Sequence, residues 1–273
     1  INRYDYINNV FTSYKKGDKG LTSNHIHCID ISDEGELWIG TEKGGICIYQ
    51  PETDSFKNIQ LNEDEGLNTV HSLLFSGDTV YAGGNESHLF KLKKSDMSIK
   101  TFVYTDLAVK ASFKKLVRGQ FAGMLWIGTR GGGMATFHEA SETFTGQLNN
   151  VGKGRQGNRG LVGTRNTVKD VLVHKDGKLW IGTAEGLSIF DPYRSTFKNI
   201  VESNDETGLS VSNIECIFED KAGSIWIGTT GGGVNVYHEN NMKFQHYKKD
   251  DQLEASLGAP SARAARPIAP PIK

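Results

Sequence analysis

The sequence predicts an all-β protein, a β-propeller of four-stranded antiparallel blades. Three observations predict this fold. A five-residue tryptophan motif recurs along the chain, similar strand and turn signals surround each copy, and no segment shows a sustained helical pattern of apolar residues. The chain also has 32 glycines against six prolines in 273 residues, which suits many short strands joined by tight turns. We expect about five complete repeats, with strands of a partial blade at the N-terminus.

The motif Leu-Trp-Ile-Gly-Thr contains all four tryptophans of the chain. Copies occupy residues 37–41, 125–129 and 179–183, and a copy that begins with isoleucine occupies 225–229. The first gap is about twice the others, and a worn copy with Tyr81 in the tryptophan place lies near its middle. Successive motif positions are then 43, 45, 54 and 46 residues apart. The residues that mark the repeat are Trp38, Tyr81, Trp126, Trp180 and Trp226. A regular period of this length predicts a repeat architecture.

Each repeat is predicted to contain four strands in a fixed order. The first is a strand-like run such as 26–31, 168–173 or 214–218, and a glycine three residues before the tryptophan then gives a tight turn. The tryptophan strand, a glycine-rich hairpin and a third strand follow. The fourth strand carries one aromatic residue, which is Phe56, Phe144, Phe197 or Phe244.

A single four-stranded sheet of this size cannot cover both of its faces, so we expect consecutive repeats to stack face to face. The tryptophan of the motif should then be wedged between adjacent blades. Burying one indole removes about 200 Å² from water, which contributes about 5 kcal/mol before entropic costs. We therefore interpret the tryptophans and glycines of the motif as structural residues.

These motifs resemble the two-component regulator propeller repeat. Residues 213–244 fit its pattern closely, with Asn213, Asp220 and Gly223 leading into the motif at 225–229, whereas residues 61–102 lack both the tryptophan and the aspartate. The resemblance covers about residues 1–250. It implies the periplasmic sensor region of a hybrid two-component histidine kinase that responds to oligosaccharides. It also implies, as partners, further blades, downstream domains and a second copy of the parent protein in a dimer.

The resemblance and the spacing together predict the organisation of the chain. Residues 1–14 look like the two outer strands of a partial blade. Residues 251–273 are rich in Ala, Pro and Arg, so we interpret them as a linker, an artificial junction or a disordered tail that adds nothing to the core. The five repeats between them, over 15–250, are 15–58, 59–102, 103–147, 148–200 and 201–250.

Composition excludes several classes of function. A net charge of −1 gives no indication of the basic surface that nucleic acid requires. The sequence contains no run of 18 apolar residues, which would predict a membrane-spanning helix. Three cysteines form neither a disulfide framework nor a Cys-x-x-Cys pair, and His25 and His27 lack a third ligand at a suitable spacing. The Gly-x-Gly-x-x-Gly sequence at 152–157 has no strand before it and no helix after it. We expect no cofactor and no metal.

The long connection over 146–167 is the strongest candidate for a functional loop. It contains four basic residues and no acidic one. In blades of this strand order, such connections and the glycine hairpins emerge on the same face, so we expect their charged side chains to gather there. Arginine offers a planar set of donors that suits carboxylates and sulfates, which predicts an acidic oligosaccharide as ligand. The candidate ligand-binding residues are Arg130, Arg155, Arg159, Arg165, Lys43 and Glu185.

Two other functions stay open at this point. A propeller can serve as a scaffold for protein partners, and a broad apolar or charged patch on one face would favour that function. A propeller glycosidase or lyase is the second alternative, because Asp33, Gly35 and Trp38 resemble the Asp-box turn of sialidases. A carboxylate pair about 5–10 Å apart in a central cleft would support an enzyme. We expect no catalytic residues and no enzymatic activity in this chain.

Overall fold

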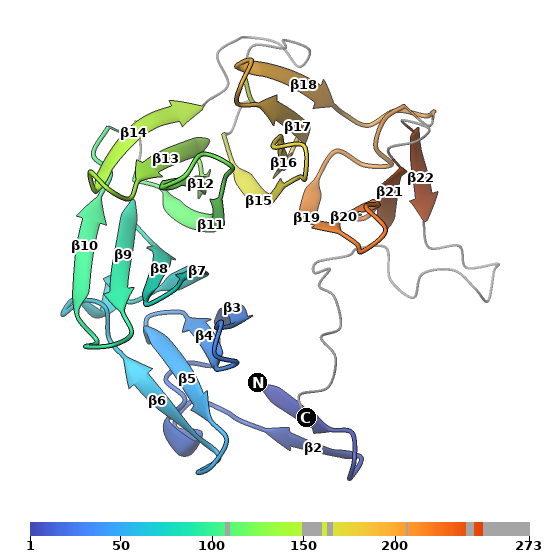
Figure 1. Ribbon diagram of the computed structural model, residues 1–273. Coiled ribbons are helices and arrows are strands. Elements are labelled where there is room, and N and C mark those ends of the chain that lie inside the picture. Colours follow the sequence, from blue (N-terminus) through green and yellow to red (C-terminus); the bar gives the residue numbers. More distant parts are fainter. Residues whose placement is uncertain (107–109, 149–159, 163–165, 206, 239–242, 248–273) are drawn as a thin grey trace. The chain divides into compact units, whose positions relative to one another are not determined.

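A computed structural model describes residues 1–106, 110–148, 160–162, 166–205, 207–238 and 243–247 (Figure 1). These residues form one two-stranded sheet, five four-stranded sheets and two short 3-10 helices, η1 (Asp18–Gly20) and η2 (Glu65–Leu67). The prediction of an all-β fold built from four-stranded blades is confirmed. The predicted tail at 251–273 lies outside the described residues. None of the described helices has the length and apolar character needed to cross a membrane.

The chain divides into two compact units, residues 1–116 and 117–273, and the boundary falls within one strand, β11. The first unit begins with a hairpin of β1 (Asn2–Asp5) and β2 (Val10–Ser13), inside the region predicted to hold two outer strands. Its next sheet consists of β3 (Ile26–Ile31), β4 (Leu37–Thr41), β5 (Ile46–Gln50) and β6 (Ser55–Ile59). The following sheet consists of β7 (Val70–Ser76), β8 (Thr79–Gly84), β9 (His88–Lys93) and β10 (Ile99–Val103).

The same four-strand order repeats along the rest of the chain. One sheet consists of β11 (Ser112–Arg118), β12 (Met124–Arg130), β13 (Met134–His138) and β14 (Thr143–Leu148). The next consists of β15 (Val168–Val173), β16 (Leu179–Thr183), β17 (Gly186–Asp191) and β18 (Thr196–Ile200). The last consists of β19 (Ile214–Glu219), β20 (Ile225–Thr229), β21 (Val234–His238) and β22 (Lys243–Tyr247).

Local sequence signals explain why the strands begin and end where they do. The predicted first strands at 26–31 and 168–173 coincide with β3 and β15, and each tryptophan motif forms a second strand. The glycine three residues before each tryptophan has a positive φ angle, which a residue with a Cβ adopts at a cost. These turn glycines are Gly35, Gly123, Gly177 and Gly223, with φ angles of 86°, 74°, 84° and 83°.

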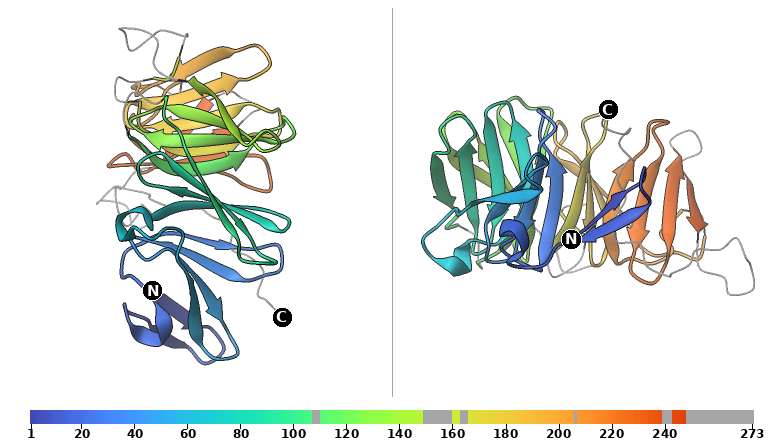
Figure 2. Two further views of the ribbon diagram at one scale, coloured as in Figure 1. Left: turned by 90° about the vertical axis from the view of Figure 1, so that its left-hand side faces the viewer. Right: turned by 90° about the horizontal axis from the view of Figure 1, so that it is seen from below.

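Three motif tryptophans are wedged between consecutive sheets, as predicted. In the first unit Trp38 of β4 packs edge-on against Phe75 of β7, with ring centroids 5.6 Å apart, where the two sheets lie side by side (Figure 2). In the second unit, the ring of Trp126 meets Phe190 of β17 at 5.8 Å, and that of Trp180 meets Tyr237 of β21 at 5.1 Å. The indoles therefore join one sheet to the next.

Trp226 is different, and the expectation that it behaves like the other three is wrong. Its side chain is 36% exposed and stacks on Tyr247, which belongs to its own sheet. Its Nε1 donates a hydrogen bond of 2.8 Å to Asp220 in the preceding turn. Within the described part of the second unit, no strand follows β22, and no further sheet of that unit packs on this indole.

The glycine of the motif allows consecutive sheets to approach closely. A Cβ added at Gly182 would lie 2.6 Å from Cγ2 of Ile214, the residue that begins β19. A Cβ at Gly128 would lie 2.7 Å from Cγ1 of Val168, the residue that begins β15. The second strand of one sheet therefore packs directly on the first strand of the next, and this contact brings the ends of the first strands together.

Candidate functional site at the bulged ends of the first strands

A β-bulge interrupts the first strand of four sheets at the same place. In β3 the register against the second strand shifts between Ile26 and Cys28, and β7, β15 and β19 shift at the matching positions. The residues at the bulges are His27, His71, Lys169 and Glu215. Bulges of this kind bend a strand and re-aim a side chain, and they occur often beside functional sites. All four bulge residues are polar or charged.

Lys114 occupies the corresponding place in β11. A Cβ at Gly83 would meet the backbone of Phe113, just as a Cβ at Gly40 would meet Val70 at the start of β7. Lys114 follows Phe113 as His71 follows Val70. The first unit therefore presents two histidines and one lysine from three consecutive first strands.

These side chains of the first unit form one hydrogen-bonded cluster. The rings of His27 and His71 lie 4.4 Å apart between centroids. His71 is only 9% exposed; its Nε2 donates to Oδ1 of Asn85 at 2.7 Å, and its Nδ1 accepts from the ammonium of Lys114 at 3.0 Å. Ser112 also donates to Oδ1 of Asn85, at 3.0 Å. The network fixes the orientation of the His71 ring and holds the ammonium of Lys114 beside it.

The pKa of His27 is lowered from its ordinary value. The first cause is the removal of water by the surrounding protein, and the second is repulsion from the charge of Lys114, while Glu42 opposes both. The neutral form of His27 is therefore favoured near pH 7 in the ligand-free protein. An anion placed beside Lys114 would offset the repulsion, so binding of an acidic group and protonation of His27 favour each other.

In the second unit the equivalent residues form an ion pair. The ammonium of Lys169 donates to Glu215 at 2.5 Å and to Oδ1 of Asn213 at 2.8 Å, and the hydroxyl of Thr230 also donates to Glu215. The charges of Lys169 and Glu215 offset each other. The bulged ends of the two units therefore differ. In the second unit a lysine pairs with a glutamate, whereas in the first unit Lys114 lies beside the ring of His71.

The structure places some predicted site residues at this same end of the sheets. Lys43 is exposed in the β4–β5 hairpin, and its backbone N–H donates to Oγ1 of Thr69 at 3.1 Å. Since Thr41 pairs with Ile26, this hairpin adjoins the bulge of β3. Lys43 therefore lies near one end of the first-unit cluster, as the strand order predicts.

The remaining predicted residues belong to the second unit. Arg130 is exposed at the end of β12 and forms an isolated bridge with Thr167, and Glu185 is half-buried in the β16–β17 hairpin. Of the residues predicted from the long connection, Arg155, Arg159 and Arg165 lie outside the described residues. Their assignment to a ligand site stays a prediction.

Sequence reasoning missed the cluster of His71, Lys114 and Asn85. A signal was present, because each first strand has, at or next to its first residue, an apolar residue followed by a polar one: Ile-His, Val-His, Phe-Lys, Val-Lys and Ile-Glu. In the structure His25 precedes β3 and lies 3.8 Å from Glu42, while His27 is at the bulge. No group of three or more His, Cys, Asp or Glu residues in the described ranges is arranged to hold a metal ion.

Comparison with known proteins supports the interpretation of the repeats. A family model described as "Two component regulator propeller" matches residues 20–43 and 208–231. These ranges include the bulges of β3 and β19. These two segments of the chain thus match the two-component regulator propeller repeat. A curated relative, Histidine kinase P4 of Formosa agariphila, is 23% identical over 196 residues, which are 69% of this chain and 14% of that protein.

Solved structures with the same fold include two extracellular domains from B. thetaiotaomicron. The domain of the hybrid two component system BT3049 is 27% identical and matches 86% of this chain and 30% of its own, with a TM-score of 0.67. The extracellular domain of BT4673 is 23% identical and matches 90% of this chain and 38% of its own, with a TM-score of 0.50. The chain thus spans about a third of these solved domains and a seventh of the curated kinase.

Proposed function

We propose that this chain is a ligand-sensing part of a bacterial two-component signalling receptor. It acts outside the cytoplasmic membrane, in the periplasm or beyond, and binds an acidic oligosaccharide or its breakdown product. The two-component regulator propeller repeats and the similarity to extracellular domains of two-component systems support the sensor role. The proposal assigns binding, and no reaction, to this chain.

The observation that carries the choice of ligand is the cationic cluster of the first unit. Lys114 has its charge beside the buried ring of His71, and His27 gains a proton most easily when an anion is present. Carboxylates and sulfates are the groups that such donors bind best. Lys43 adds a further exposed cation at the same end of these sheets.

Ligand binding would act on the receptor by shifting an equilibrium. A ligand that contacts one arrangement of the receptor dimer better than another favours that arrangement by its difference in affinity. The first strands β7, β11, β15 and β19 suit this role, because each is packed on the motif glycine of the preceding sheet. Binding at several first strands therefore biases the arrangement of whole sheets.

Calorimetric titration with neutral, uronic-acid and sulfated oligosaccharides tests the proposal. Replacement of Lys114 by Met keeps the aliphatic stem and removes the charge, and we expect it to weaken an acidic glycan at least about tenfold, or about 1.4 kcal/mol. Arg130→Ala and Arg159→Ala test the predicted residues of the other unit in the same way. Lys57→Ala, at an exposed position of β6, is the matched control.

The pH dependence gives a second readout. Because the pKa of His27 is lowered, its protonation should add affinity for an acidic glycan as the pH falls below about 6.5. His27→Gln should remove that increase while leaving the affinity at pH 8 unchanged. The proposal is wrong if no acidic glycan binds, or if a glycan binds and none of Lys114→Met, Arg130→Ala and Arg159→Ala weakens it.

A further inference from the structure

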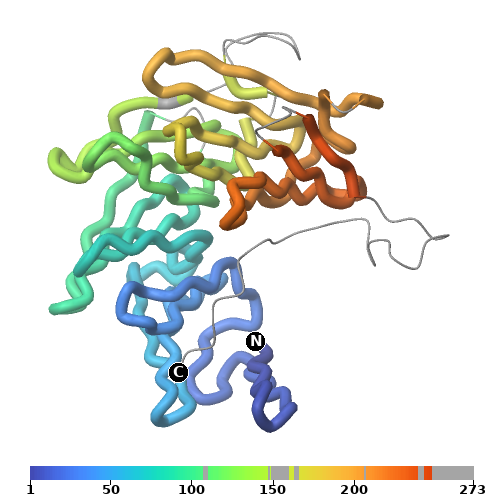
Figure 3. The backbone as a smooth tube through the Cα atoms, turned by 45° about the vertical axis from the view of Figure 1, so that its right-hand side comes forward, coloured from blue at the N-terminus to red at the C-terminus, as the bar shows by residue number. Residues whose placement is uncertain are grey.

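The second unit contains a pocket that belongs neither to the bulged strand ends nor to the predicted arginine loop. It has a volume of about 310 Å³ and lies between the β15–β18 and β19–β22 sheets, which are neighbours in Figure 3. Along β15 the bulge lies where Val168 pairs with Thr183, whereas the pocket lies beyond the pair of Val173 and Leu179. The pocket is therefore at the opposite end of these sheets from the bulges.

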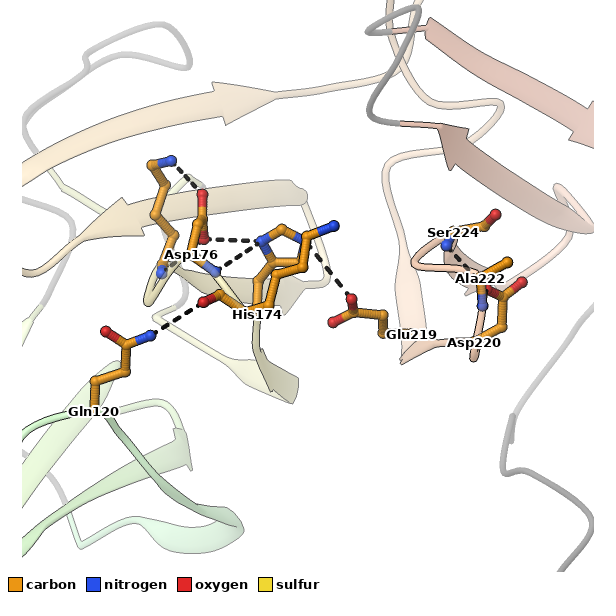
Figure 4. Close-up of polar contacts among 9 residues, drawn as sticks. Gln120, His174, Asp176, Glu219, Asp220, Ala222 and Ser224 are labelled. Carbon is orange, nitrogen blue, oxygen red and sulfur yellow. Dashed lines mark hydrogen bonds and ion pairs between the residues drawn. The ribbon is translucent and has the colours of Figure 1, made fainter.

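A buried histidine forms the polar part of the pocket (Figure 4). His174 is only 4% exposed, and its Nδ1 lies 2.8 Å from Oδ1 of Asp176. Its Nε2 points across to Glu219 of the next sheet, 3.8 Å away. Asp176 also accepts from the ammonium of Lys178. The two carboxylates hold the imidazole in one orientation from both sides.

Asp176 stays ionised over the whole physiological range. Burial raises the pKa of its carboxyl, but hydrogen bonds from Lys178 and His174 outweigh that effect and bring the pKa down to about 2. Asp191, the other acidic residue of the lining, accepts two backbone N–H groups of its own turn, those of Tyr193 and Arg194. Both carboxylates of the lining are thus already engaged with donors of the protein.

The cations at the mouth are arranged differently. Arg194 and Lys198 line the pocket from the β17–β18 turn and from β18, and both side chains are exposed. Neither guanidinium nor ammonium forms an ion pair with a described carboxylate. An apolar wall beside them is made by Ile189 and by the aromatic rings of Tyr237 and Trp180, whose centroids lie 5.1 Å apart.

We propose that this pocket binds a small carboxylate-bearing sugar, such as a single uronic acid residue. Its volume is near the lower end of the range for ligand sites, which suits one or two rings. Arg194 and Lys198 would hold the carboxylate, and the aromatic wall would cover the apolar face of the ring. Thr196 offers a hydrogen-bonding group for the hydroxyls. This site and the proposed oligosaccharide site belong to different units and share no residues. The pocket also lies at the end of its sheets opposite to the bulges.

The experiment titrates the chain with glucuronate and, in parallel, with neutral glucose, following tryptophan fluorescence because Trp180 lines the pocket. We expect saturable binding of glucuronate, and binding of glucose at least about tenfold weaker. Arg194→Glu should weaken glucuronate at least about tenfold, because it replaces an attraction by a repulsion. Lys221→Glu makes the same charge change at an exposed position of the neighbouring β19–β20 turn, outside the lining, and should leave the affinity within about twofold.

Two further comparisons separate this site from the first. Lys114→Met should not affect glucuronate binding, and Arg194→Glu should not affect the acidic oligosaccharide. Thermal melts of Arg194→Glu should match the parent, since the side chain is exposed. The pocket proposal is overturned if glucuronate does not saturate, if glucose binds equally well, if Arg194→Glu leaves the affinity unchanged, or if only Lys114→Met abolishes binding.

Discussion

The two tryptophans of the second unit provide a direct test of how the sheets stabilise one another. Trp180 is 4% exposed and packs on Tyr237 of the next sheet, whereas Trp226 is 36% exposed and stacks on Tyr247 of its own sheet. Replacing a buried tryptophan by alanine costs about 3–5 kcal/mol. The exposed fraction of Trp226 is larger than that of Trp180 by about a third. Because an indole buries up to about 250 Å², this difference amounts to about 80 Å² of surface that is already in water.

At about 25 cal/mol per Å², that area is worth about 2 kcal/mol. We therefore expect Trp180→Ala to cost about 3–5 kcal/mol and Trp226→Ala about 1–3 kcal/mol. Urea denaturation followed by circular dichroism measures the loss of stability in both variants. The two losses can be compared directly because Trp180 and Trp226 belong to the same unit. Trp180→Phe, which keeps an aromatic ring at the sheet interface, is the control and should cost less than Trp180→Ala. Equal losses for the two alanine variants would refute the argument that the next sheet provides the difference.

Three further predictions concern packing, pH and the end of the chain. Gly182→Ala should destabilise the second unit by about 1–3 kcal/mol, because its Cβ would overlap Ile214; a double-mutant cycle with Ile214→Ala should show coupling, and additive losses would contradict the contact. The pKa of Asp176 is lowered on folding to about 2, so its contribution to stability is complete above its unfolded value near 4 and is lost as the pH falls towards 2. Asp176→Asn should flatten the fall in melting temperature over that window, and an unchanged pH profile would contradict the prediction. Truncation after Ser256 should leave the melting temperature unchanged, whereas a drop of several degrees would show that residues 257–273 pack on the fold.

Much of the fold could be predicted because residues that are close along the chain determine the turns and strands of each repeat. The turn glycines, such as Gly35 and Gly177, need a positive φ angle that other residues adopt at a cost, so their positions mark the turns. The apolar runs at 26–31 and 168–173 become strands without change of bounds. The tryptophan motif predicted stacked sheets, because one sheet alone leaves an indole without a partner.

The candidate sites depended on information that no single repeat contains. The bulges at His27 and His71 are shifts of register between the first and second strands, and the alternation of residues along the chain does not reveal them. The hydrogen bonds of His71 join β7 to Asn85 in the β8–β9 turn and to Lys114 in β11. His71 and Lys114 belong to different sheets and meet only when these sheets stack.

The sequence by itself determined the period, the strands, the turns and the residue type that each sheet offers to its neighbour. Only the tertiary structure decided which copy of a motif residue is buried and which polar groups meet. Trp180 and Trp226 occupy the same place in the same motif, yet one is covered by the next sheet and the other is not. The pocket that His174 lines likewise lies between two sheets, and Glu219 approaches the imidazole from the second of them. Local preference is set by neighbours along the chain, whereas burial and electrostatics are set by neighbours in space.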